Sequence, residues 1–239
     1  MTVSDRYRTA WDGFWEQSSG EQGEPFWDAD PDLTARRDLE HLAPYADSSL
    51  PVADLGCGNG TQTRFLAGHF ARAVGVDLSA AAVAHARRAD PDGVAAYEQL
   101  NLADPAAAAT LHERLGDTHV YLRAVLHQSD PEDRPAVAAA VARLVGARGR
   151  ALVLEPTGEA KGVIAALAEQ PGGPSSKLRR VKEHDLRPGE VAEGEVAGLL
   201  RAAGLTVFAE GATALAMSET RLDGSPVELP ARWYVAGRR

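Results

Sequence analysis

One segment constrains the fold of this chain more than any other: a short apolar run followed by three closely spaced glycines. Residues 52–61 read VADLGCGNGT, with glycines at positions 56, 58 and 60. The apolar run predicts a buried strand, and the glycines predict a sharp turn into a helix, where the backbone approaches a ligand closely. The spacing differs from the G-x-G-x-x-G of dinucleotide sites, and Asp54 would repel a pyrophosphate but pair with an amine.

The rest of the chain alternates short apolar runs with longer helical patterns, as βαβ units do. Strands are predicted at 51–55, 73–76, 94–100, 119–123, 150–155, 205–210 and 232–236. Helices are predicted at 61–70, 80–88, 105–115, 130–145 and 190–203. The pattern weakens between residues 156 and 189, where a basic run at 177–182 indicates a solvated loop, a helix face or part of a lid. We therefore expect an α/β fold with a mostly parallel sheet.

Composition narrows the classes of partner. Apolar residues make up 44% of the 239 residues and charged residues 25%, which predicts a single globular unit. A net charge of −9 argues against nucleic acid as the main partner. No apolar run approaches the length of a membrane span, and the charged N-terminus does not resemble a signal peptide. Cys57 is the single cysteine, and the scattered histidines show no metal-ligand spacing, so we expect a cytoplasmic protein without a metal site.

Three segments resemble the motifs of class I S-adenosylmethionine-dependent methyltransferases. DLGCGNGT at 54–61 resembles the first motif, VGVDLS at 74–79 the second, and NLAD at 101–104 the third. In the family the second-motif acid, here Asp77, accepts hydrogen bonds from both ribose hydroxyls, and a polar side chain of the third motif meets the adenine amine. The family more often has Asp where this chain has Asn101, and Asp104 is the alternative.

The resemblance implies S-adenosyl-L-methionine as cofactor and a Rossmann-like class I methyltransferase fold. That fold has a seven-stranded, mostly parallel sheet with helices on both faces, here with an N-terminal helical cap. The residues that it implies for cofactor binding are Asp54, Gly56, Cys57, Gly58, Thr61, Asp77, Leu78, Asn101, Leu102 and Arg123. Arg123 is expected to bind the carboxylate of the cofactor, and its alternatives are a substrate carboxylate or a surface or structural role.

The N-terminal segment 1–46 is predicted to be a helical cap or lid, and 47–239 the cofactor-binding domain. Its aromatic residues weakly resemble those of thiopurine-methyltransferase-like proteins, where they close over the cofactor. Trp11 and Trp15 are four residues apart and share one face of a helix. We expect four aromatic residues at the substrate, unless they only pack the helix against the sheet: Trp11, Trp15, Phe26 and Trp27.

His127 is the candidate catalytic residue. It follows the fourth predicted strand, and ligands of α/β folds bind at the carboxyl ends of parallel strands. The surrounding segment resembles small-molecule methyltransferases in which the matching histidine is the general base, although Gln128 stands where Asp or His is usual. The alternative is a histidine that caps the loop or contacts the cofactor.

These features predict methyl transfer to an oxygen or nitrogen atom of a small molecule, by a monomer or a homodimer. The alanine-rich composition indicates specialised metabolism in a GC-rich bacterium. Two alternatives stay open: an enzyme that uses S-adenosylmethionine for cyclisation or for cleavage of another sulfonium bond, and a catalytically silent cofactor-binding sensor or partner protein.

Overall fold

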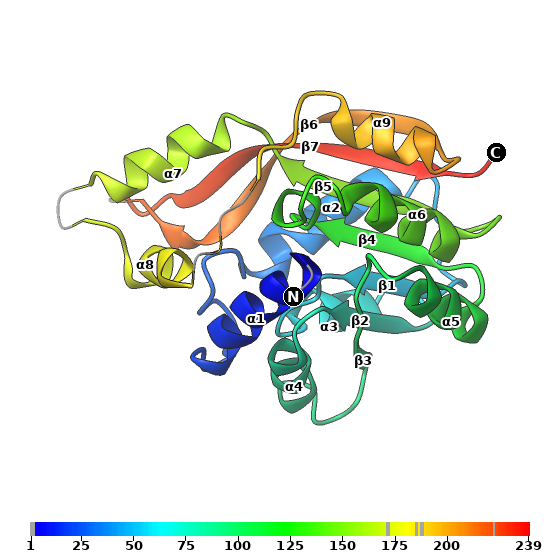
Figure 1. Ribbon diagram of the computed structural model, residues 1–239, viewed down its shortest axis with the longest axis horizontal. Coiled ribbons are helices and arrows are strands. Elements are labelled where there is room, and N and C mark those ends of the chain that lie inside the picture. Colours follow the sequence, from blue (N-terminus) through cyan, green and yellow to red (C-terminus); the bar gives the residue numbers. More distant parts are fainter. Residues whose placement is uncertain (1–2, 171–172, 185, 187–188, 222) are drawn as a thin grey trace.

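The computed structural model describes residues 3–170, 173–184, 186, 189–221 and 223–239. Within them the chain forms a seven-stranded sheet of order β3-β2-β1-β4-β5-β7-β6 (Figure 1). Strands β1 to β5 are parallel, and β7 runs antiparallel to both β5 and β6. The seven-stranded, mostly parallel sheet is therefore confirmed. The strands are β1 (Val52–Leu55), β2 (Ala73–Asp77), β3 (Ala96–Gln99), β4 (His119–Arg123), β5 (Ala151–Pro156), β6 (Thr206–Thr220) and β7 (Pro226–Gly237).

Helices cover both faces of this sheet. One face packs against α5 (Pro105–Leu115), α6 (Arg134–Val145) and α9 (Glu195–Ala202), and its core contains side chains such as Leu55, Leu122 and Leu144. The other face packs against α2 (Ala35–Leu42), α3 (Thr61–Ala67) and α7 (Ala160–Ala168). Helix α4 (Ala80–Arg88) packs against β3. Strands β1 and β5 are almost wholly apolar because both of their faces are covered.

Polar side chains cap the starts of two of the helices. Ser79 accepts the Ala82 N–H at the start of α4, and Asp104 accepts the Ala106 N–H at the start of α5, where Pro105 occupies the first turn. Each cap satisfies a backbone donor that has no partner within the helix. The bounds predicted for these two helices, 80–88 and 105–115, are thus confirmed.

Several predicted boundaries are wrong. The helix expected from 130 begins at 134, the helix expected from 190 begins at 195, and β3 is shorter than predicted. The largest difference is the C-terminal hairpin, because β6 and β7 extend far beyond 205–210 and 232–236 (Figure 1). The weak region between 156 and 189 contains α7 and α8 (Ser176–Glu183), so the basic run lies on a helix whose Leu178 is buried.

The predicted cap at 1–46 contains two helices in different places. Helix α1 (Val3–Glu16) lies against α4, where Ser79 Oγ donates to Asp12 Oδ1 (2.6 Å) and His85 Nε2 donates to the Trp15 carbonyl (2.8 Å). Helix α2 packs against the sheet instead, and the Tyr121 hydroxyl donates to Asp38 Oδ2 (2.6 Å). None of the helices in the described part of the chain is long and apolar enough to cross a membrane.

Candidate active site

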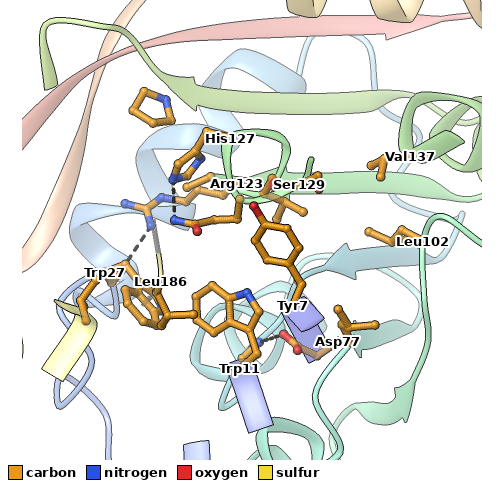
Figure 2. Close-up of a pocket in the computed structure, with 18 of the residues that line it drawn as sticks. Tyr7, Trp11, Trp27, Asp77, Leu102, Arg123, His127, Ser129, Val137 and Leu186 are labelled. Atoms are coloured by element: carbon orange, nitrogen blue, oxygen red, sulfur yellow. Dashed lines mark hydrogen bonds between the residues drawn. The ribbon is translucent and has the colours of Figure 1, made fainter. Parts of the chain in front are cut away.

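A cavity of about 620 Å³ lies at the carboxyl ends of the parallel strands. Its walls come from α1, the loops after β1, β2, β3 and β4, helix α8 and the β6–β7 hairpin. Figure 2 shows Asp77 and Leu102 on one side of this cavity and Tyr7 near its middle. Trp27, Arg123 and His127 lie on the other side. The cavity is thus where a doubly wound sheet binds ligands.

The glycine loop after β1 passes close to other groups. Gly56 has φ +79° and Gly58 φ +55°, a conformation that L side chains rarely adopt. A Cβ on Gly56 would lie 2.6 Å from Val125 Cγ2, and a Cβ on Gly58 would lie 2.9 Å from Trp15 Cζ2. A side chain at either position would collide with these neighbours, and both glycines line the cavity, so the bare backbone of the loop borders it.

Asp77 ends β2 with both carboxylate oxygens directed at backbone donors. Oδ2 accepts the Gly58 N–H and Oδ1 accepts the Ser79 N–H, each at 2.9 Å. Burial raises the pKa of Asp77, and these two N–H groups act in the opposite direction. Each oxygen keeps a lone pair for a further donor, which suits a ligand with two adjacent hydroxyls.

Asn101, Leu102 and Leu78 also line this side of the cavity. Asn101 Oδ1 accepts the Ala103 N–H at 3.0 Å, so one lone pair of that oxygen stays available for an adenine amine. Asp104, the alternative for this role, caps α5 and does not line the cavity.

Three predicted cofactor residues lie behind the glycine loop and do not line the cavity. Asp54 accepts a hydrogen bond from Thr63 Oγ1 (2.5 Å), and burial raises its pKa to about 7. Cys57 packs in the small cluster that joins α4 to β3. Thr61 Oγ1 donates to Asp28 Oδ2 at 3.2 Å. These three residues pack on the side of the loop that faces away from the cavity.

Arg123 lies at the end of β4, with 8% of its side chain exposed. Its guanidinium donates to the carbonyls of Trp27 (3.3 Å) and Ala216 (2.8 Å), and Nε lies 3.8 Å from Asp38 Oδ2. The side chain therefore links the N-terminal segment, α2 and β6, and it lines the cavity on the side away from Asp77 (Figure 2).

His127 forms a buried pair with Glu155, the residue before the last of β5. His127 Nδ1 lies 2.8 Å from Glu155 Oε2, while Glu155 Oε1 accepts the N–H groups of Val125 (2.8 Å) and Leu126 (2.7 Å). Because an ionised carboxylate only accepts, the proton lies on Nδ1 and Nε2 carries the lone pair. Gln128 Nε2 lies 2.9 Å from His127 Nε2, and Gln128 Oε1 is buried with no partner among the described residues.

The structure brings all four predicted aromatic residues to the cavity: Trp11, Trp15, Phe26 and Trp27. Trp15 is 2% exposed and covers Gly58, whereas Trp11 and Trp27 are half-buried, with ring centroids 5.3 Å apart. Trp11 and Trp15 lie on the same side of α1, as their spacing predicts.

Comparisons with known proteins identify this arrangement. Residues 52–149 match the family model described as a methyltransferase domain. An S-adenosylmethionine-dependent methyltransferase from Anabaena variabilis shares 26% identity, with coverage of 100% of this chain and 96% of that chain and a TM-score of 0.87. The chain has a class I S-adenosylmethionine-dependent methyltransferase domain.

More distant structures share this fold. Magnesium protoporphyrin IX methyltransferase from Synechocystis PCC 6803, solved with bound S-adenosylmethionine, is 16% identical, with 100% and 98% of the two chains covered and a TM-score of 0.62. A structure from the conversion of a disulfide bond into a thioacetal group during echinomycin biosynthesis is 22% identical. It covers 97% of this chain and 92% of that chain, with a TM-score of 0.69. No curated protein matches the sequence.

S-adenosylmethionine is the cofactor of this type of domain, and the cavity residues fit it. Gly56 and Gly58 border the cavity with backbone alone, and Asp77 keeps acceptor capacity for a diol. Sequence reasoning missed Glu155 and the hairpin residues Leu215, Met217 and Leu229. An acid at the end of the strand next to β4 was the available signal for Glu155, because neighbouring parallel strands end at the same edge.

Proposed function

We propose that this chain transfers a methyl group from S-adenosylmethionine to an oxygen or nitrogen nucleophile of a small molecule, with His127 as general base. The observation that carries the proposal is the His127–Glu155 hydrogen bond of 2.8 Å beside the cavity. It leaves the Nε2 lone pair of His127 on the cavity side of the ring. A histidine suits deprotonation of a phenol or ammonium because its ordinary pKa lies near neutral pH.

Bound S-adenosylmethionine supplies an electrophilic methyl group on a positively charged sulfur atom. Gly56, Gly58, Asp77, Asn101 and Leu102 would hold it. The protein would then accelerate transfer mainly by holding the nucleophile in line, since correct orientation alone supplies a large part of such a barrier.

Gln128 occupies the position at His127 Nε2 that a nucleophile must take. Its amide donates to Nε2, so the acceptor's O–H or N–H must replace it before His127 can remove a proton. The proton would then pass to Nε2 while the acceptor atom bonds to the methyl carbon and the carbon–sulfur bond breaks, which leaves S-adenosylhomocysteine. Glu155, 2% exposed, stabilises the resulting imidazolium through Nδ1.

The test begins with calorimetric titration of S-adenosylmethionine and S-adenosylhomocysteine, on the wild type and on Asp77→Ala. We expect binding that the variant loses. A screen of phenols, alcohols and amines by mass spectrometry then identifies a methylated product. His127→Gln should lower kcat about 10²- to 10⁴-fold while S-adenosylhomocysteine affinity is unchanged.

Three outcomes would contradict the proposal. Full activity of His127→Gln would remove the base role. A cofactor-derived product without methyl transfer would favour the cyclising or bond-cleaving alternative, and cofactor binding without turnover in any screen would favour the silent sensor.

We also propose a small-molecule partner, a cytoplasmic location, a role in specialised metabolism and a monomer or homodimer. The mostly apolar cavity supports a small acceptor, since sites for small molecules are concave and mostly apolar. The net charge of −9 disfavours a polyanionic partner.

A further inference from the structure

The side of the cavity away from Asp77 is lined by apolar side chains from four segments of the chain. We call these residues the acceptor chamber: Phe26, Leu178, Val181, Leu215, Met217 and Leu229. They belong to one packed cluster, with Val181 at its partly buried edge. Leu229 and His127 also line a second cavity of about 60 Å³ together, so the chamber begins beside the catalytic histidine.

The described cationic side chains beside the acceptor chamber are either paired within the protein or exposed to solvent. The Arg123 guanidinium is occupied by the carbonyls of Trp27 and Ala216 and is paired with the buried Asp38. Lys182, the other cation among the described residues that line this side, is exposed on α8. A charged group of the acceptor would therefore lose its hydration without gaining a buried counter-charge, which is costly.

Hydrogen-bonding capacity is concentrated at one end of the chamber. Among the described residues, Gln128 Oε1 is buried without a partner, and the neighbouring His127 Nε2 accepts from the amide of the same glutamine. A buried acceptor without a donor is unfavourable, and a ligand hydroxyl would donate its one proton to Gln128 Oε1 or, once the amide has been displaced, to His127 Nε2. The half-buried rings of Trp11 and Trp27 also line the cavity and offer aromatic surfaces to a planar ring.

We propose that the methyl acceptor is an uncharged aromatic molecule with a hydroxyl group, whose ring occupies the acceptor chamber and whose hydroxyl lies at Gln128 and His127. This inference rests on the proposed function and deepens it, because it names the substrate class of the same site.

Calorimetric titration of the S-adenosylhomocysteine complex with four matched probes tests the inference. The probes are 2-naphthol, 2-fluoronaphthalene without a donor, saturated decahydro-2-naphthol, and anionic 2-naphthoate. We expect 2-naphthol to bind most tightly. The fluoro analogue and the anion should bind about tenfold or more weakly, and the saturated alcohol several-fold more weakly.

A charge placed in the chamber provides the matched variant. Val181→Asp should weaken 2-naphthol binding about tenfold or more, because it puts a carboxylate against the ring. Val94→Asp makes the same substitution at a residue that is 56% exposed, and should leave binding unchanged. Unchanged S-adenosylhomocysteine affinity shows that each variant is folded.

Two results would overturn the inference: tighter binding of 2-naphthoate than of 2-naphthol, or no 2-naphthol binding by a protein that binds S-adenosylhomocysteine. Equal binding of 2-naphthol and 2-fluoronaphthalene would also contradict the hydroxyl site. These titrations need no turnover, so normal probe binding without methyl transfer would count against the proposed function alone.

Discussion

Arg134 connects the His127 loop to the segment before α9. Its side chain is 2% exposed and donates to the carbonyls of Leu126 (3.1 Å) and Glu190 (3.0 Å) and to Glu195 Oε1 (2.7 Å). Arg134→Met would leave these acceptors without a donor, and we expect it to destabilise the fold by about 3 kcal/mol. Urea unfolding measures this change.

Arg143→Met, at an exposed position of the same helix, is the control and should change stability by less than about 0.5 kcal/mol. Equal losses of stability in the two variants would contradict the role of Arg134 in connecting these segments.

Residues that act through local sequence were predictable, and residues that act through spatial neighbours were not. Gly56, Gly58 and Asp77 occur at a spacing that places them together in any βαβ unit, and all three line the cavity. Glu155 lies 28 residues from His127, and its role depends on the pairing of β4 with β5. The pairing of β4 with β5 cannot be read from the residues around His127 or around Glu155; it follows only from the order of the strands in the sheet.

At the scale of elements, the β6–β7 hairpin shows why the C-terminal strands were underestimated. Pro230 lies within β7, and proline removes a ladder donor, so the sequence pattern is interrupted there. The structure tolerates Pro230 because β5 ends at Pro156, opposite Ala231. The part of β7 that includes Pro230 therefore pairs with β6 alone. The extended part of the hairpin supplies Leu215, Met217 and Leu229. Half of the acceptor chamber therefore lies on residues that the sequence pattern did not predict as strands.

Gly211 of β6 provides a prediction about this hairpin. It is paired with Trp233 of β7, and a Cβ would lie 2.8 Å from Trp233 Nε1. Trp233 stacks on His41 of α2 with centroids 4.1 Å apart, so displacing it disturbs the contact of the hairpin with α2. We expect Gly211→Ala to destabilise by about 1–3 kcal/mol in urea unfolding.

The matched control for Gly211 is Gly198, in helix α9, where a Cβ would meet open space. Gly198→Ala should stabilise the protein by about 0.5–1 kcal/mol, since alanine is the better helix residue. The two identical substitutions are thus expected to have opposite signs. Stabilisation by Gly211→Ala would show that the hairpin accommodates a methyl group at this position.

The whole molecule contains an ionisable group at the centre of its sheet. Asp54 is 4% exposed in β1, and burial raises its pKa to about 7 from an ordinary value of 3.8. Thr63 Oγ1 donates to it and lowers the pKa, while the charge of Asp77 raises it, but burial is the largest effect. The folded protein therefore holds a proton between these two pH values that the unfolded chain has already released.

Because the folded pKa of Asp54 is raised, its contribution to stability is present at low pH and is lost as pH rises toward 7. We expect Asp54→Asn to lack this loss, so the unfolding free energy of the variant relative to wild type should increase by roughly 2–3 kcal/mol between about pH 5 and pH 7. Urea unfolding at several pH values measures it. Asp92→Asn, in an exposed turn, is the control and should show a constant difference from wild type. Parallel curves for Asp54→Asn and wild type would mean that Asp54 is already ionised in the folded protein at pH 5.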